Sequence, residues 1–462
     1  MIRRKPGVFM SDIRITTTWS LVPGVLLFGA AMVLHRPASA VPAFAEQTGR
    51  NCAACHVGGY GPELTQFGRE FKLGGYTLRM HQSVPLSAMA IASWTHTRKD
   101  QVPPPEHLSR NDNLVLDQAS LFVAGGIGDH FGGFAQLVTY DGVGRSWSWD
   151  NIDLRAVTNA KLFGKDSVLG LTLNNNPTVQ DPWNTLPAWG FPFTDTAVSQ
   201  TPSAGELIDD PLGGNTLGIS AYGWIDHKFY AEIGGYRTPS RGFLNFVGMD
   251  PADPGSIHGI APYGRVAYQS DLAGGTFEVG ANLLKAALFP GRDRSSGFTD
   301  RYTDWGLDSS WLKSVGKSDS FSANVRFEHE RGDLRASCAL ALVGDGSDPN
   351  CARYHLNEWR AAFRYTWHGK VGFTVSPFSI TGSRNFNLYE GNGRPDSTGV
   401  LGQIDFTPWG AGNSPLGPRL NARFGLQYTL YGKFNGRRRN YDFAGANARD
   451  NNALRLFTWV AF

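Results

Sequence analysis

The sequence predicts an all-β protein, a 16-stranded antiparallel transmembrane β-barrel that begins near residue 86 and follows a small N-terminal segment. Three observations support this prediction. Strand-length segments alternate between polar and apolar residues, short turns alternate with long loops, and the last segment ends on the aromatic residue Phe462. Outer-membrane barrels combine the first two features, and the aromatic terminus resembles the pattern by which such proteins are recognised for insertion.

The N-terminus has the three parts of a secretory signal. Arg3, Arg4 and Lys5 supply positive charge, residues 19–34 form an apolar core, and Ala38-Ser39-Ala40 is a small-residue cleavage site. The alternative is an uncleaved anchor helix, which the short core, broken by a proline, disfavours. We therefore expect residues 1–40 to be a cleaved signal peptide. Beyond them no apolar run is long enough for a transmembrane helix.

Composition fits a large β-structure that does not bind nucleic acid. The chain has 462 residues, 56 of them glycine, and 12% are aromatic. The formal net charge is only +3, and the one basic block is 437–439. Nucleic-acid-binding domains carry clustered positive charge, so this class has little support.

Between residues 355 and 367 the alternation is clearest. One face carries Trp359, Ala361, Phe363, Tyr365 and Trp367, with aromatic residues at both ends. A lipid-facing surface with two interfacial aromatic girdles has this appearance. The opposite face includes arginines and threonine, which suit a wet lumen better than a packed core. Residues 420–430 and 321–328 repeat the pattern.

Short turns at 164–166, 226–228 and 368–370 alternate with long loops at 177–213, 238–258, 332–354 and 433–449. Barrels of outer membranes have short periplasmic turns and long external loops, so both chain ends of the barrel should be periplasmic. The predicted strands cover 86–98, 112–125, 131–141, 149–163, 167–176, 214–225, 229–237, 259–270, 274–287, 301–314, 319–331, 355–367, 371–383, 396–408, 418–432 and 450–462.

The pentapeptide Cys52-Ala53-Ala54-Cys55-His56 follows the predicted cleavage site closely. Two cysteines separated by two residues and followed by histidine form the attachment motif of c-type haem. The thiols of Cys52 and Cys55 would add to the haem vinyl groups, and His56 would be an axial iron ligand. A disulfide or half a zinc site is the alternative, but no second Cys/His pair has zinc spacing.

Residues 41–85 are therefore expected to be a monohaem cytochrome c segment that plugs the barrel of residues 86–462. So short a segment buries too little apolar surface to fold alone, and one covalent haem c would complete its core.

The sixth ligand is open at this stage. Met80 suits a cytochrome c-like site, with His81 as its close rival. Met89 and His96 are the other nearby candidates, and a vacant position is a further alternative.

Residues 62–76 are expected to pack on the haem. Phe67 and Phe71 can line the porphyrin, while Arg69 and Lys72 can pair with its propionates. The alternative for either cation is a solvated surface position.

Cys338 and Cys351 flank a loop rich in glycine, aspartate and serine. In an oxidising compartment they are expected to form a disulfide, which would contribute about 3 kcal/mol for a loop this short. Free thiols are the alternative.

Residues 42–77 resemble the outer-membrane monohaem cytochrome–porin fusions of iron-oxidising bacteria. The shared features are PAFA-x-QTG, the CxxCH motif, and Pro-x-Leu leading into FGR-x-FK-x-x-GY. The resemblance implies an Fe(II)-oxidising cytochrome in the outer-membrane bilayer. It would take electrons from extracellular Fe(II) and pass them to a periplasmic electron carrier, a cytochrome.

Two other functions stay open from the sequence. The chain could be a diffusion porin with a tethered cytochrome, or could accept electrons from a donor other than iron. Asp209, Asp210, Asp250 and Asp253 on predicted long loops are candidates for an iron site, although loop carboxylates are usually only solvated. The sequence does not set the oligomeric state.

Overall fold

The protein is described here by a computed structural model covering residues 43–80, 85–209, 211–344, 353–389, 391–417 and 419–462. The predicted signal peptide, residues 1–40, lies outside this part of the chain.

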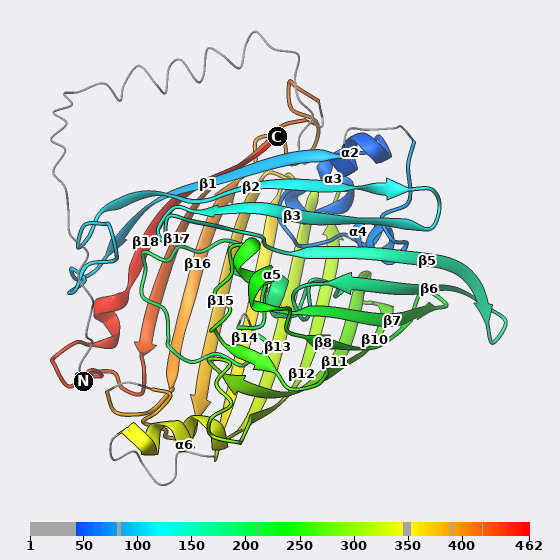
Figure 1. The fold of residues 1–462 in the computed structure, drawn as a ribbon. Coiled ribbons are helices and arrows are strands. Elements are labelled where there is room, and N and C mark those ends of the chain that lie inside the picture. Colours follow the sequence, from blue (N-terminus) through cyan, green and yellow to red (C-terminus); the bar gives the residue numbers. More distant parts are fainter. Residues whose placement is uncertain (1–42, 81–84, 210, 345–352, 390, 418) are drawn as a thin grey trace, which may run out of the picture. The chain divides into compact units, whose positions relative to one another are not determined.

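Sixteen antiparallel strands form a closed barrel, which confirms the predicted fold class (Figure 1). Closure comes from β1 and β18, which pair from Met89 opposite Ala461 to Thr97 opposite Ala453. The barrel strands are β1 (Leu86–Thr97), β2 (Asn113–Ile127), β3 (Phe131–Asp141), β5 (Ile152–Leu162), β6 (Lys165–Asn174), β7 (Leu217–Ile225), β8 (Phe229–Arg237), β10 (Ala261–Leu272), β11 (Gly275–Pro290), β12 (Asp300–Val315), β13 (Asp319–Leu334), β14 (Arg353–Trp367), β15 (Val371–Gly382), β16 (Ser397–Phe406), β17 (Asn421–Lys433) and β18 (Ala453–Ala461). Two short strands, β4 (Ser146–Ser148) and β9 (Gly255–Ile257), pair with β3 and β11.

Most boundaries fall within a few residues of the prediction, and β3 and β8 match it at both ends. The predicted strand 149–163 is the exception, because residues 149–151 separate β4 from β5. At this break the indole of Trp149 donates a hydrogen bond to the carbonyl of Gly214 at 2.8 Å. A contact with a distant loop thus interrupts a locally regular pattern.

The connections follow the predicted alternation with one departure. Short turns join most strand pairs at the end where β1 starts and β18 stops, and long loops lie at the other end. Residues 407–420, between β16 and β17, form a long connection on the short-turn side. We call the two ends the short-turn end and the long-loop end.

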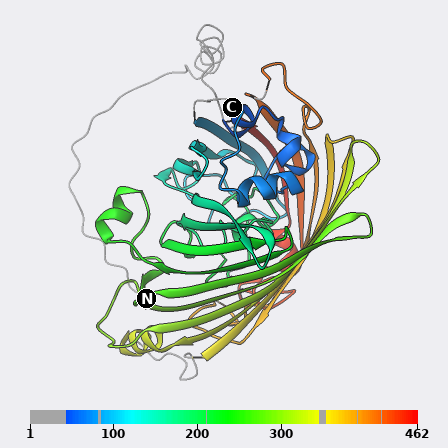
Figure 2. The same ribbon diagram turned by 90° about the vertical axis from the view of Figure 1, so that its right-hand side faces the viewer.

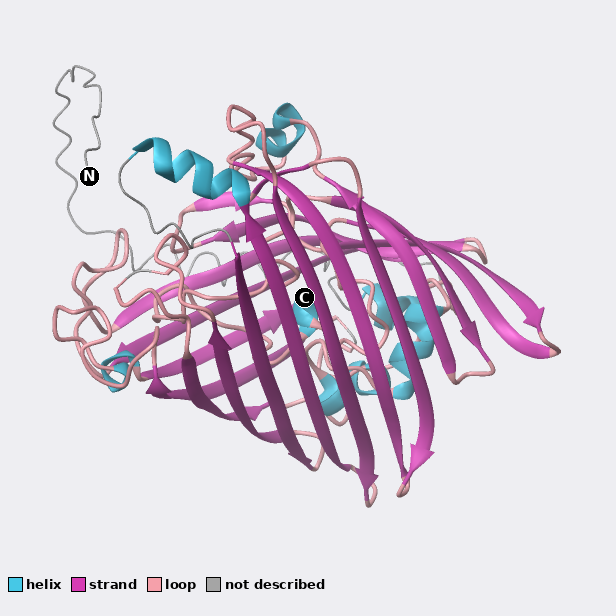
Figure 3. Cartoon of the chain, turned by 90° about the horizontal axis from the view of Figure 1, so that it is seen from below, coloured by secondary structure: helices cyan, strands magenta, loops and turns pink. Residues whose placement is uncertain are grey.

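The aromatic face of β14 points outward, as predicted. Trp359, Phe363 and Trp367 are exposed, as are Phe424, Leu426 and Leu430 on β17. Residues directed away from the lumen of a closed barrel are those that meet lipid. The outer wall is therefore an apolar surface suited to a bilayer, and Figure 3 shows its tilted strands.

The charged inner face differs from the expectation of a wet lumen, because many of its residues are buried among other protein groups. Arg265 of β10, for example, is fully buried and pairs with Asp308 of β12 at 2.7 Å and with Glu278 of β11 at 3.3 Å. Two segments fill the space: residues 43–80 and the described residues of the loop 175–216, which are 175–209 and 211–216 and which we call the lumen loop.

The lumen loop is tied to the wall by polar contacts. The backbone N–H groups of Leu207 and Ile208 donate to Glu330 and Asp304 at 2.6 and 2.9 Å. The hydroxyl of Thr185 donates to Asp308 at 2.6 Å. Because these carboxylates stand on β12 and β13, the loop crosses the lumen and packs against the far wall.

Residues 43–80 contain the helices α2 (Ala43–Thr48), α3 (Cys52–Cys55), η1 (Val57–Gly59) and α4 (Gln66–Leu73). We call residues 43–80 the plug. The hydroxyls of Tyr222 and Tyr76 link it to the wall, donating to the Leu73 carbonyl at 2.6 Å and to Asp153 at 2.7 Å. Asn421 donates to the Gly59 carbonyl at 2.7 Å. The plug thus contacts β5, β7 and β17, and Figure 2 shows it enclosed by the sheet.

The remaining helices are η2 (Pro187–Trp189) in the lumen loop, and α5 (Arg241–Phe246), α6 (Arg335–Gly344) and η3 (Ala448–Asn451) in long loops. Among the described residues no helix has the length and apolar character needed to cross a membrane.

The outward direction of Val325, near the middle of β13, can be tested by placing a charge there. Val325→Arg should destabilise the barrel by about 2–4 kcal/mol in lipid, because a guanidinium near the bilayer midplane is poorly solvated. Denaturant unfolding in vesicles measures this cost. Val325→Leu is the control and should stay close to wild type, and equal midpoints for both variants would contradict the outward assignment.

Candidate functional site

The CxxCH sequence forms the short helix α3, which Asn51 caps by accepting a hydrogen bond from the Ala54 N–H at 3.2 Å. At its end the His56 N–H donates to the Cys52 carbonyl at 2.9 Å. Residues three apart on a helix lie on the same face, so the helix brings Cys52 and Cys55 together. His56 follows in an extended conformation, which ends the helix.

Helix α4 packs directly on this motif. Thr65 caps α4 by accepting from the Gly68 N–H at 3.2 Å, and its own N–H donates to the Cys55 carbonyl at 2.9 Å. A Cβ on Gly68 would stand 2.3 Å from that same carbonyl oxygen. The glycine at this position therefore permits the close approach of α4 to α3.

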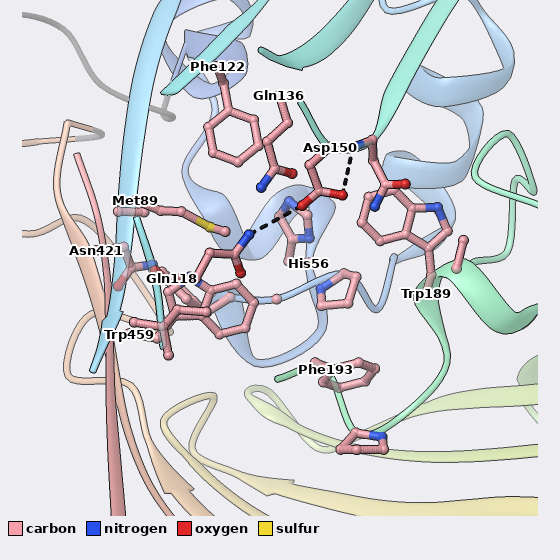
Figure 4. Close-up of a pocket in the computed structure, with 18 of the residues that line it drawn as sticks. His56, Met89, Gln118, Phe122, Gln136, Asp150, Trp189, Phe193, Asn421 and Trp459 are labelled. Atoms are coloured by element: carbon pink, nitrogen blue, oxygen red, sulfur yellow. Dashed lines mark hydrogen bonds between the residues drawn. The ribbon is translucent and has the colours of Figure 1, made fainter. Parts of the chain in front are cut away.

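A cavity of about 390 Å³ lies beside Cys52 and His56 (Figure 4). Its volume is within the range of roughly 300–1,000 Å³ found for small-molecule and cofactor pockets. The plug forms one wall, and the other walls come from the barrel and the lumen loop. Its main side chains are Met89, Gln118, Phe122, Gln136, Asp150, Trp189, Phe193, Asn421 and Trp459.

Cys52 and His56 line this cavity, and the motif as a whole has the donor atoms that covalent haem needs. Cys52 and Cys55 are free cysteines, and burial raises the pKa of Cys52 above its ordinary value and that of Cys55 to about 11. Nδ1 of His56 is buried and has no hydrogen-bond partner among the described residues. Burial also lowers the pKa of His56 to about 4, which favours the neutral imidazole that binds metal.

Of the sixth-ligand candidates, the structure brings Met89 to the cavity. Met89 is on the inward face of β1, and its thioether points into the cavity (Figure 4). Met80 is 67% exposed and is not among the lining residues. His96 also lies elsewhere on β1, where Nδ1 is 2.9 Å from Asp112. His81 lies outside the described residues.

Phe67, Phe71, Arg69 and Lys72 were expected to surround the haem, but none of them lines the first cavity and each has other surroundings. Phe67 lines a second cavity that also borders His56, and Phe71 packs edge-on against Phe44 and Tyr76. Lys72 is buried and binds the lumen loop, donating to the Val179 and Asp181 carbonyls at 2.8 and 2.7 Å.

Arg69 is likewise buried and outside the first cavity, and its Nε and Nη1 have no partner among the described residues. The solvated surface expected as the alternative for the two cations is wrong for both Arg69 and Lys72, which are buried within the lumen.

The cavity walls supplied by the barrel were not anticipated from the sequence. Trp459 of β18 packs edge-on against Tyr60 of the plug at 4.9 Å between ring centroids. Gln118 of β2 donates to Asp150 at 3.3 Å across the upper wall. Alternation along β18 places Trp459 on the lumen side. An aromatic residue of this size on the lumen face was the feature of the sequence that could have indicated a cavity wall there.

Cys338 of α6 is disulfide-bonded. Its predicted partner, Cys351, lies outside the described residues, so the pairing stays a prediction.

Comparison with known proteins adds only distant structural similarity. No family model matches the sequence, and no curated protein matches it. Among solved structures, Salmonella typhi OmpF is similar with a TM-score of 0.48 and 11% identity, covering 82% of this chain and 97% of that one. Pseudomonas putida OprB has a TM-score of 0.47 and 9% identity, over 82% and 94% of the chains. An anion-selective porin from Comamonas acidovorans has a TM-score of 0.43 and 12% identity, over 81% and 98%.

The seating of the plug on the barrel can be tested at two adjacent glycines. Both Gly58 and Gly59 have positive φ, so alanine costs about 1–2 kcal/mol of backbone strain at either position. A Cβ on Gly59 would also stand 2.4 Å from the Gly410 carbonyl oxygen, whereas Gly58 has its nearest neighbour at 3.4 Å. Gly59→Ala should therefore loosen the plug more than Gly58→Ala.

Limited proteolysis of the two variants measures this difference. Cleavage within residues 43–80 should be faster in Gly59→Ala, and equal rates would show that the close approach to Gly410 does not hold the plug.

Proposed function

We propose that this chain is an outer-membrane electron conduit with one c-type haem, bound covalently by Cys52 and Cys55 and axially by His56. It takes electrons from an extracellular donor and passes them to a periplasmic cytochrome. Fe(II) is the donor that we propose. The observation that carries the proposal is the position of the CxxCH motif. Cys52 and His56 of this motif line a cavity inside the barrel, where the Cys52 thiol is free and Nδ1 of His56 has no hydrogen-bond partner among the described residues.

The position of the cavity supports a connecting role. The plug precedes β1 at the short-turn end, which is the periplasmic end of outer-membrane barrels. The lumen loop that forms the opposite wall, with Trp189 and Phe193, enters from the long-loop end. A group held between them lies between segments that enter from the two ends of the barrel.

When bound, haem supplies a centre that gains and loses one electron. The two cysteines would hold it, His56 would orient it, and Phe122, Trp189 and Trp459, which line the cavity, would surround it. Exclusion of water by such residues raises the reduction potential, because the more highly charged iron state is less well solvated. A high potential suits an acceptor of electrons from Fe(II).

Met89 is our choice for the second axial ligand. It belongs to a wall strand, whereas His56 belongs to the plug, so iron coordination by both would fasten the plug to the barrel. Met89 lies opposite Ser120 of β2 and Ala461 of β18, both of which hold its backbone in the ladder. Thioether ligation raises the potential relative to bis-histidine ligation, consistent with the proposed direction of electron flow.

Methionine ligation has a spectroscopic signature that separates the candidates. Met89→Ala should remove the thioether-to-iron charge-transfer band of the ferric protein and lower its midpoint potential. Met80→Ala is the matched control and should leave both unchanged, since Met80 is exposed and away from the cavity. Loss of the band in Met80→Ala, or its survival in Met89→Ala, would exclude Met89.

A diffusion porin with a tethered cytochrome is the second candidate, and the closed 16-stranded barrel favours it. The buried contacts of the lumen loop argue for the conduit instead, because they occupy space through which a solute would pass. Lys72 joins the plug to this loop through three hydrogen bonds, so the two obstructions support each other.

One pair of measurements separates these functions. Anaerobic addition of Fe(II) to the purified haem protein should produce the absorption bands of reduced haem, while the protein in planar bilayers should conduct ions poorly. Absence of haem reduction from acidic to neutral pH would exclude Fe(II) as donor. High conductance without Fe(II)-dependent reduction would establish the porin.

A further inference from the structure

Three carboxylates meet inside the barrel at the side of the lumen loop. Glu206 and Asp209 belong to this loop and Glu358 to β14, and one oxygen of each lies within 4.8 Å of the others. Asp209 was among the loop residues singled out in the sequence. Glu206 and Glu358 were not, because they are about 150 residues apart in the sequence and only the fold brings them together.

Glu206 is the unusual member of the three. Its side chain is 0% exposed, and neither of its carboxylate oxygens has a hydrogen-bond partner among the described residues. A buried polar group without a partner is costly, and a buried charge far more so. Glu206 is directed at two other carboxylates and has no positive partner in the described part of the chain. A cation bound between the three groups would supply one.

The neighbouring cations are already engaged. Arg326 binds Asp209 at 3.1 Å and Glu358 at 2.9 Å, and Arg360 binds Glu358 through both of its oxygens. Two guanidinium groups thus serve two of the three carboxylates, Arg326 binding both Asp209 and Glu358 and Arg360 binding Glu358. Glu206 is the carboxyl group of the three that is left without a cationic partner among the residues that the structure describes.

We propose that Glu206, Asp209 and Glu358 bind a divalent cation, and that Fe(II) occupies this site as the electron donor. Identification of the cation as Fe(II) rests on the proposed function, whereas the cation site itself does not. Carboxylate oxygens are preferred ligands of small divalent cations. For bonds of about 2.1 Å, ligand oxygens around such an ion lie about 3.0 Å apart when adjacent and about 4.2 Å apart when opposite, so the three carboxylates would draw closer together on binding.

The site can be reached and lies beside the cavity. The Asp209 side chain is 24% exposed, and water can complete the coordination there. On the other side, Arg326 separates the carboxylates from the cavity wall. A Cβ on Gly190, which lines the cavity, would stand 3.1 Å from Nη1 of Arg326. One side chain therefore divides the cation site from the cavity of the proposed haem.

The electron transfer balances without any further reactant. Bound Fe(II) gives up one electron and becomes Fe(III), and the ferric haem of the proposed function accepts that electron and becomes ferrous. No covalent bond changes, and the periplasmic carrier then oxidises the haem. Three carboxylates stabilise Fe(III) more than Fe(II) because of its higher charge, which makes the bound Fe(II) a stronger reductant.

Mn²⁺ is the probe for the site, since it has similar ligand preferences and can be followed by electron paramagnetic resonance. The full-length protein in detergent should have one tight Mn²⁺ site, and any further Mn²⁺ ions should bind more weakly. Glu206→Gln should weaken this binding by about tenfold or more. Tenfold is the lower end of the loss in metal affinity seen when a group that supports a metal site is removed. Asp209→Asn is the second variant, because its partly exposed loop position makes misfolding less of a concern.

Glu328→Gln is the matched control. Glu328 is also a fully buried lumen glutamate with one unpartnered oxygen, but it is outside the three-carboxylate cluster. It should retain Mn²⁺ binding. Wild-type protein without a tight Mn²⁺ site, or equal affinity in wild type, Glu206→Gln and Asp209→Asn, would overturn the cation site.

Haem reduction distinguishes this inference from the proposed function. Mn²⁺ should inhibit Fe(II)-dependent reduction in wild type, and Glu206→Gln should slow reduction while Glu328→Gln does not. Tight Mn²⁺ binding without any reduction by Fe(II) would leave the cation site intact and refute the proposed function. Reduction that is equally fast in Glu206→Gln and insensitive to Mn²⁺ would refute the donor role of this site.

Discussion

Pairing of β1 with β18 closes the sheet, and this closure determines where every other group can lie. Inside a bilayer no water is available to satisfy backbone N–H and C=O groups, so a sheet with open edges is excluded. Closure also fixes two faces, because alternate residues of each strand must point to lipid or to the lumen. Trp359 and Phe363 point outward, while Glu358, directly before Trp359, points inward. Polar groups that cannot face lipid are therefore concentrated in a narrow interior.

That concentration explains why the lumen is filled by protein. Buried charges are tolerated only when they are paired and hydrogen-bonded, and single wall residues cannot satisfy one another across a wide barrel. The lumen loop brings Thr185 and the backbone of Leu207 to Asp308 and Glu330, and the plug brings Tyr76 to Asp153. The same contacts that satisfy the wall also position the motif around His56. Filling the barrel and positioning the cavity are thus one arrangement.

How much of this could be predicted from sequence depends on the range of the interaction. Strand alternation and turns are local, so β3 and β8 match their predicted bounds, and the CxxCH motif is contained in five residues. Placement of the plug side chains is not local. Lys72 looks like a solvent-exposed cation in its own helix, and only the lumen loop, about a hundred residues later, provides its partners. Met80 and Met89 are likewise equivalent in sequence, and only the inward direction of β1 separates them.

The order of groups along the barrel gives the arrangement a direction. Glu358 lies a few residues from the long-loop end of β14, and Arg326 is near the middle of β13. Met89 and Ala461, at the cavity, stand near the short-turn ends of β1 and β18. Along this line the carboxylate cluster comes first, the guanidinium of Arg326 next, and the aromatic-lined cavity last. If the proposed cation site is occupied, Arg326 lies between the cation and the cavity and opposes its passage further inward, whereas an electron faces no such barrier. The interior would then separate the path of iron from the path of the electron.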